Sequence, residues 1–417
     1  MSKKVTDPRF AHAEGYTAIA FGKSGQFVFT GGSDCLVRVF RASKSERDQE
    51  AVTLEQHSDN VLSLAVSGGK VISGDEEGMV FSFDLSTSSV SGADGLSIEP
   101  SGTVLRSPLP ARDISIGNGD KQVAIATDDE SVRIVSLLDM SLLHTLDGHR
   151  GAVNSVCYSP DSIYLASASC DGTVRVWDMR DGDPSCVHII HKMAYVCEPG
   201  NSMEQFKVRW SPDGRFLAVP CPDHSVKLVE RNSWEVSASL AGTHSKMIIH
   251  LTWSSNSRYI ASVGLENNVV VWDVAARKSI LTHACANPLC QVEWNPCGNM
   301  LAFTDNTGAM YVWDDVVPVD QGHAAPFERK AVEYGTLSRN KRRSGSDAGA
   351  NGLMSDLFDD TAAADKMEID GMDGSGSVSG GDESEDDGDG DALGDDGEGI
   401  TDALDDFIID DDGAGYV

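Results

Sequence analysis

The feature that most constrains this chain is a unit that returns seven times. Each unit ends in a short apolar strand, and these strands align without gaps when they are set to end at Phe40, Phe83, Val135, Trp177, Val229, Trp272 and Trp313. The spacings between these ends are 43, 52, 42, 52, 43 and 41 residues. A period just above 40 is typical of four-stranded propeller blades, which bury their faces only against neighbouring blades. The sequence therefore predicts an all-β, seven-bladed propeller over residues 1–320.

Each unit also holds an earlier alternating strand and a turn such as SPDG or NPCG, in which Pro presets φ and Gly tolerates positive φ. We expect residues around Val5–Phe10 to close the ring by adding an outer strand to the last blade. The two 52-residue intervals predict solvated loops at Ser86–Ser107 and Asp183–Met203. Loops on a rigid scaffold are common binding positions.

The charge of the chain is concentrated after the repeats. The formal net charge is −32, and residues 344–417 hold 24 Asp or Glu against one Lys, hence −23. This segment has few large apolar residues and cannot offset its ordering entropy, so we predict a disordered acidic tail after a basic linker at 321–343. Residues 1–343 carry the remaining net charge of −9. A body of this sign predicts weak DNA binding at most.

Several classes are excluded by composition. The chain holds no run of 18 apolar residues, which argues against a membrane span, and its N-terminus lacks the apolar core of a signal peptide. Nine scattered Cys favour a reducing compartment over a disulfide framework.

Blade four predicts a hydrogen-bond chain of His149, Asp171, Trp177 and one of two serines, Ser167 or Ser169. Equivalent residues recur around the ring at His12, His57 and His244, and at Asp34, Glu77, Asp129, Asp223 and Glu266. A Ser–His–Asp set also suggests a hydrolase. Because a catalytic triad would not be repeated around a ring, and no nucleophile elbow is present, we predict a structural chain, no enzyme and no cofactor.

Two further sets are candidates for binding. Arg38, Arg133, Arg175 and Lys227 occupy one equivalent position in four blades, where they either pair with neighbouring turns or form a shallow basic track for a partner. The soft residues Cys186, His188, His191 and Cys197 lie close together, although their spacing matches no standard zinc pattern. Metal binding there is an alternative, and the favoured interpretation is a loop without metal.

The linker and tail carry signals of their own. Arg339, Lys341, Arg342 and Arg343 form a candidate nuclear-import signal. Ser379 and Ser384 each precede an acidic residue by three positions, which suits an acidophilic kinase.

The repeat ends DGTVRVW, NNVVVW and GAMYVW resemble those of WD-repeat propellers. The strings RFAHAEGYTAIAF, YLASASCDGTVRVWD, VKLVERNSW, DLFDD and DDFIIDDDGAGY together look like the N-terminal propeller and acidic linker of one family. That family is the acidic nucleoplasmic DNA-binding protein, also called the chromosome transmission fidelity replisome adaptor or WD repeat and HMG-box DNA-binding protein. Full-length members continue into a second propeller that trimerises, so we expect this chain to be a fragment or a truncated gene model.

The resemblance implies a non-enzymatic nuclear scaffold that links the replicative helicase to DNA polymerase α–primase and other chromatin factors. We expect this chain alone to be a monomer, and a trimer only where a C-terminal region is present. A competing hypothesis is a substrate receptor of a cullin-ring ubiquitin ligase, because Trp177 to Arg180 resembles a Trp-Asp-x-Arg signature.

Deletion of residues 339–343 is expected to move a fluorescent fusion from the nucleus to the cytoplasm, because the deletion removes the densest cluster of cations in the chain. Fluorescence microscopy of the intact and deleted fusions measures this. A deleted fusion that stays nuclear would show that these cations are not the sole signal.

Overall fold

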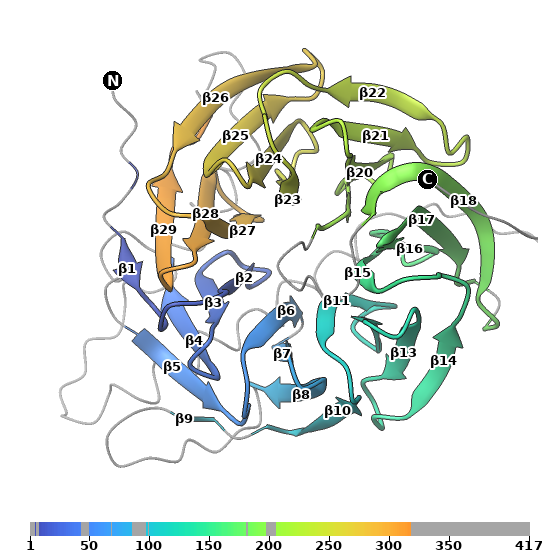
Figure 1. The fold of residues 1–417 in the computed structure, drawn as a ribbon. Coiled ribbons are helices and arrows are strands. Elements are labelled where there is room, and N and C mark those ends of the chain that lie inside the picture. Colours follow the sequence, from blue (N-terminus) through green and yellow to red (C-terminus); the bar gives the residue numbers. More distant parts are fainter. Residues whose placement is uncertain are drawn as a thin grey trace, which may run out of the picture. The chain divides into compact units, whose positions relative to one another are not determined.

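The protein is a seven-bladed β-propeller, as the repeat predicted (Figure 1). The computed structural model describes residues 5, 8–42, 50–67, 69–85, 97–98, 100–180, 182–196 and 206–317. In this part of the chain no helix is long and apolar enough to cross a membrane. The predicted basic linker and acidic tail, with the import and phosphorylation candidates, lie outside the described residues.

Every blade is a sheet in which four strands follow one another from the centre of the ring outward, each antiparallel to its neighbour (Figure 1). Blade 1 consists of β2 (Ala18–Phe21), β3 (Phe27–Gly31), β4 (Leu36–Arg41) and β5 (Glu50–Glu55). Blade 2 consists of β6 (Val61–Ser67), β7 (Lys70–Asp75), β8 (Met79–Asp84) and β10 (Gly102–Arg106). Blade 3 consists of β11 (Ala111–Gly117), β12 (Gln122–Thr127), β13 (Val132–Ser136) and β14 (Leu142–Leu146). Blade 1 also receives β9 (Ser97–Ile98), which pairs with β5 in parallel.

The other four blades repeat the same arrangement. Blade 4 consists of β15 (Val153–Tyr158), β16 (Tyr164–Ser169), β17 (Asp171–Asp178) and β18 (Ser185–Val196). Blade 5 consists of β19 (Arg209–Trp210), β20 (Phe216–Pro220), β21 (Val226–Glu230) and β22 (Val236–Leu240). Blade 6 consists of β23 (Ile248–Trp253), β24 (Tyr259–Gly264), β25 (Asn268–Asp273) and β26 (Lys278–Ala284). Blade 7 consists of β27 (Leu289–Trp294), β28 (Met300–Asp305), β29 (Ala309–Asp314) and β1 (Arg9–Phe10).

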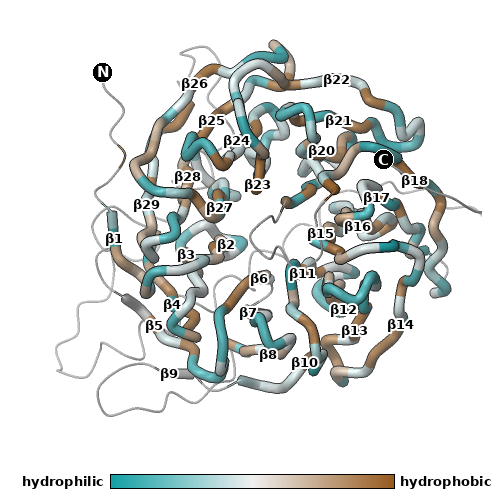
Figure 2. Tube along the Cα trace, in the orientation of Figure 1, coloured by the Kyte–Doolittle hydropathy of each residue, from teal (hydrophilic) through white to brown (hydrophobic). Residues whose placement is uncertain are grey.

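The core lies between neighbouring blades rather than at one centre. One cluster joins Phe29 of blade 1 to Phe83 of blade 2, and another joins Leu228 of blade 5 to Trp272 of blade 6. Figure 2 shows apolar stretches recurring in strands around the ring. Each sheet therefore buries its faces against the next one, as the repeat period requires.

The N-terminal segment closes the ring, as predicted. Strand β1 pairs with β29, with Arg9 opposite Met310, and Val5 forms a bridge with Trp313. The carbonyl of Gly308 then accepts hydrogen bonds from the amides of Ala11 (2.9 Å) and His12 (3.0 Å). Contacts between β2 and β27 complete the inner ring.

Two predicted loops are partly wrong. Residues 102–106 form β10, the outer strand of blade 2, and residues 185–196 form β18, the outer strand of blade 4. An outer strand is covered on one edge only, so its residues are mostly polar or half-exposed and lack the alternation of a buried strand. Residues 86–96 of the first predicted loop and 197–203 of the second lie outside the described residues.

Gly308→Ala is expected to weaken ring closure. A Cβ at this residue would lie 2.1 Å from the carbonyl oxygen of His12 and 2.5 Å from that of Ala13. The control is Gly119→Ala, which has a similar positive φ (61° against 78°) but nothing within 4 Å of its Cβ. We expect about 1–2 kcal/mol of destabilisation for the control from backbone strain, and about 1–3 kcal/mol more for Gly308→Ala from overpacking. Urea unfolding measures the difference, and equal losses would contradict it.

Candidate functional site

Polar side chains at the centre of the ring come from two equivalent positions of the innermost strands. In five of these strands the pairing register shifts near the first position, which marks it as a β-bulge. The first position holds Ala18, Ser63, Asp113, Ser155, Lys207, His250 and Gln291, in blade order. The second position, two residues later and therefore on the same strand face, holds Ala20, Ala65, Ser115, Cys157, Arg209, Thr252 and Glu293.

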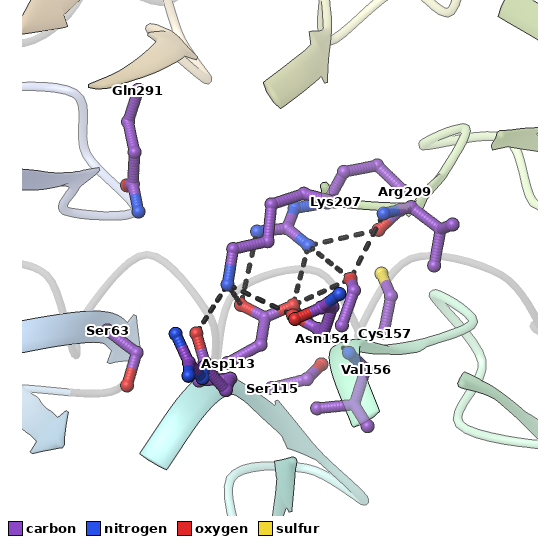
Figure 3. A network of polar contacts seen from close by, with 12 residues as sticks. Ser63, Asp113, Ser115, Asn154, Val156, Cys157, Lys207, Arg209 and Gln291 are labelled. Carbon is purple, nitrogen blue, oxygen red and sulfur yellow. Dashed lines mark hydrogen bonds and ion pairs between the residues drawn. The ribbon is translucent and has the colours of Figure 1, made fainter. Parts of the chain in front are cut away.

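The carboxylate of Asp113 joins three consecutive blades (Figure 3). Its Oδ2 atom accepts hydrogen bonds from the Ser155 hydroxyl (2.7 Å) and the Val156 amide (3.0 Å) of blade 4. From blade 5, Arg209 donates Nη1 to Oδ2 (3.0 Å) and Nη2 to Oδ1 (3.4 Å). The Lys207 ammonium lies 3.3 Å from Oδ1. One buried carboxylate therefore holds two cations and two neutral donors.

The Lys207 side chain is 1% exposed, which is rare for a lysine. Besides Asp113, its Nζ donates to the main-chain carbonyls of Arg112 and of Asn154 (3.3 Å). These three acceptors use all three protons of the ammonium. Lys207 is therefore satisfied by blades 3 and 4, although it belongs to blade 5.

Burial and charge act against each other on these groups. Burial alone would raise the pKa of Asp113, but Arg209 and Lys207 lower it to about 2. Burial lowers the pKa of Lys207 to about 8, although Asp113 opposes this. Burial raises the pKa of Glu293 to about 7, against the effect of Arg209. The network thus holds one firmly ionised carboxylate and two groups that titrate near neutral pH.

Asp113→Asn is expected to destabilise the ring by about 3–5 kcal/mol, because removing one partner leaves buried cations without a counter-charge. The folded pKa of Asp113 lies below its ordinary value of about 3.9. Its stabilising effect is therefore present above about pH 4 and is lost as pH falls toward 2. Urea unfolding at pH 7 and pH 3 should show the variant closer to wild type at the lower pH. The exposed residue Asp183 provides a control, since Asp183→Asn should change little at either pH; a similarly small effect of Asp113→Asn would contradict the role of Asp113.

The structure also brings together the predicted quartet of blade 4. His149 contacts Asp171 through Nδ1 (3.0 Å) and Ser167 through Nε2 (2.7 Å), and Trp177 donates Nε1 to the Ser167 hydroxyl (2.9 Å). Ser169 instead donates to the carbonyl of Gly151 (2.8 Å). Of the two serines, Ser167 is therefore the one that belongs to the hydrogen-bond chain of His149, Asp171 and Trp177.

Related arrangements recur in three other blades. His244 contacts Glu266 and Ser262 in blade 6, and His12 contacts Asp34 and Thr30 in blade 1. In blade 2 the prediction that Glu77 occupies the carboxylate position is wrong, because His57 Nδ1 contacts Asp75 Oδ2 instead (2.8 Å). Asp75 lies two residues earlier and is fully buried, while Glu77 accepts from the exposed Ser58 hydroxyl.

The cations of the predicted basic track are mostly paired with their own turns. Arg38 pairs with Asp34, Arg133 with Asp129 and Lys227 with Asp223, in each case four residues away. Arg175 donates to the carbonyl of Gly148 (2.6 Å) and to the sulfur of Cys186 (3.8 Å). This geometry favours the interpretation that the cations pair with neighbouring turns, and it leaves little positive charge for a partner.

Two other candidates are occupied by local contacts. The Arg180 Nε atom lies 3.0 Å from both carboxylate oxygens of Asp178. Cys186 donates to the carbonyl of His188 (3.6 Å), the His188 ring stacks on Trp234, and His191 is exposed. Cys197 lies outside the described residues, and among those described no three metal-ligating side chains gather.

The inner network was not predicted from the sequence. The signal was present in the strings FKVRW, IHLTW and CQVEW, where alternate positions of a buried strand are polar. Such alternation is typical of a sheet with one solvated face. Here it marks residues that meet one another at the centre of the ring.

Comparison with known proteins assigns the fold to a family. The family model described as WDHD1 first WD40 domain matches residues 9–312, which span all seven blades. Minichromosome loss protein 1 of Schizosaccharomyces pombe is 25% identical over 373 residues, which are 87% of this chain and 42% of that protein. WD repeat and HMG-box DNA-binding protein 1 is 28% identical over 316 residues in Xenopus laevis and 27% over 314 residues in Homo sapiens. These matches cover 75% and 74% of this chain and 26% of each relative. The chain thus spans between 26% and 42% of the length of these relatives.

Proposed function

The chain belongs to the family of the WDHD1 first WD40 domain, and we propose from this membership that it is a non-enzymatic nuclear scaffold of the DNA replication fork. In this role it links the replicative helicase to DNA polymerase α–primase and to other chromatin factors. The observation that carries the proposal is the family match over residues 9–312. The relatives' names, minichromosome loss protein and DNA-binding protein, support a role on chromosomes.

The geometry supports binding rather than catalysis. The histidines His12, His57, His149 and His244 each contact a hydroxyl and a carboxylate that hold the blade together. Their repetition in four blades indicates a structural task, because an active site is built once. A rigid ring offers its rim and connecting loops to several partners.

The charge distribution supports the rest of the proposal. The acidic segment 344–417 repels a phosphate backbone, so DNA binding is weak and falls steeply with salt. In the proposed role the cations at 339–343 direct nuclear import, and Ser379 and Ser384 are phosphorylated by an acidophilic kinase. The closed sheets favour a monomer for this chain by itself.

Affinity purification of the tagged chain from dividing cells, followed by mass spectrometry, tests the scaffold role. We expect replicative helicase and polymerase α–primase subunits to be enriched over a control purification with an unrelated seven-bladed propeller. Arg180→Ala should leave this set unchanged, because Arg180 is tied to Asp178. Enrichment of a cullin adaptor that Arg180→Ala abolishes, without replication subunits, would contradict the scaffold and support the ligase alternative.

A further inference from the structure

The outer strand of blade 4 differs from the outer strands of the other blades. Strand β18 has 12 residues, whereas β5, β10, β14, β22 and β26 have between five and seven. No described strand pairs with its outer edge, which faces away from the ring (Figure 1). Alternate residues of such an edge direct their amides and carbonyls outward, so the edge can accept a further strand.

This edge lacks the features that usually block pairing with another chain. From Ser185 to Ile190 it contains no charged residue, Pro or Gly. At Lys192 φ is positive (58°), the register with β17 shifts, and the next residue, Met193, is buried, so the edge ends there. Strands β14 and β22 also lack charges, but each has only five residues. We call residues 185–191 the β18 edge.

An aromatic surface lies beside the β18 edge. The ring of Trp234 in blade 5 stacks on His188 of β18, with the centroids 6.2 Å apart, and packs edge-to-face with Tyr164 (5.1 Å). Trp234 is half-buried, while Val236 and Val187 are 48% and 45% exposed. Tyr and Trp side chains are enriched at binding interfaces. The edge is therefore flanked by side chains that favour a partner.

Blade 1 shows what kind of segment an outer edge of this ring accepts. Strand β9 pairs in parallel with the outer edge of β5, with Ser97 opposite Thr53 and Ile98 opposite Leu54. This added segment is short and extended, and it belongs to the connection between β8 and β10 of blade 2. An extended segment from outside the blade is thus an occupant that the architecture accommodates.

The charges at the two ends of the β18 edge differ. His191 and Lys192, at the C-terminal end, are exposed and form no ion pair with any described residue. Asp183 is exposed and precedes the N-terminal end. An acidic residue of an added strand is therefore favoured beside Lys192 and disfavoured beside Asp183.

We propose that the β18 edge, together with Trp234 and Val236, binds an extended peptide segment of a partner protein as a fifth strand of blade 4. The peptide backbone pairs with the open edge, and its alternate apolar side chains pack on Trp234 and Val236. An acidic residue at the end beside Lys192 fixes the direction of the peptide. In this mode the backbone bonds supply affinity, and the side-chain contacts supply specificity.

The test uses the full chain as bait for a phage-displayed library of random peptides of about twelve residues, which is long enough to span the edge. We expect enriched peptides in which apolar and polar residues alternate and acidic residues lie at one end. Binding of a synthesised peptide should slow amide hydrogen exchange at residues 185–191 and leave β14 unchanged. Failure to enrich any peptide, or slowed exchange only in another blade, would overturn the proposal.

Variants locate the bound peptide. Val187→Asp and Val236→Asp place a charge on the apolar surface and should weaken binding by about tenfold or more. Leu142→Asp is the matched control, because Leu142 is 55% exposed on β14, the outer strand of blade 3, and it should leave the affinity unchanged. Lys192→Glu should weaken binding by about fivefold at low salt and by less at high salt. Equal affinities for wild type, Val187→Asp and Val236→Asp would overturn the site.

A second copy of the chain is the competing occupant of the β18 edge. Light scattering separates the two, because a dimer that Val187→Asp converts to a monomer would overturn the peptide proposal, and a monomeric wild type supports it. The proposal is argued from the geometry of blades 4 and 5 and the selection uses no replication protein. Its outcome therefore leaves the purification test of the scaffold role unaffected.

Discussion

The burial of each sheet against the next is the interaction on which the rest of this structure depends. A four-stranded blade has two apolar faces and too few residues to cover them itself, so neither Phe83 nor Trp272 would be buried in an isolated blade. Seven blades bury all of these faces only if the last blade also packs against the first. The hydrogen bonds of the Gly308 carbonyl to the N-terminal segment, and the contacts between β27 and β2, complete that circle.

A closed ring brings seven innermost strands together, so the space around the axis limits the size of the side chains that face it. Side chains from two positions per strand meet there, and large apolar residues at all of them would overfill the space. Small residues fill these positions in blades 1 and 2, while blades 3 to 7 hold mostly polar residues. Several of these bond across blade boundaries, as Arg209 does to Asp113 and Thr252 does to Glu293. Asp113 stabilises the buried cations Lys207 and Arg209, because both of its carboxylate oxygens meet donors. A charged pair without such bonds would cost more than it returns.

The sequence was sufficient for the features that repeat. The seven strand ends, the closing strand near Val5–Phe10 and the contacts of His149 with Ser167 and Asp171 all follow from comparing one unit with the next. The features that differ between blades were missed. Strands β10 and β18 resemble loops because only one edge of each is paired, and Asp75 replaces Glu77 because blade 2 has a different spacing after its histidine. The contacts of Asp113 join residues about 95 positions apart, which no local pattern reveals.

The pairing of Val5 with Trp313 has a topological consequence. In each of the other six blades the four main strands follow one another along the chain. Blade 7 instead takes its outer strand β1 from a segment about 300 residues away in sequence. The ring therefore has a seam, by which we mean the blade that is completed by pairing β1 with β29. Which blade contains the seam depends on where the repeats begin in the chain, not on how a blade is built. Joining the two segments by a short linker and opening the chain between two other blades would move the seam while every sheet kept its neighbours. The propeller is in this sense a circle on which the pairing of β1 with β29 marks one point among seven.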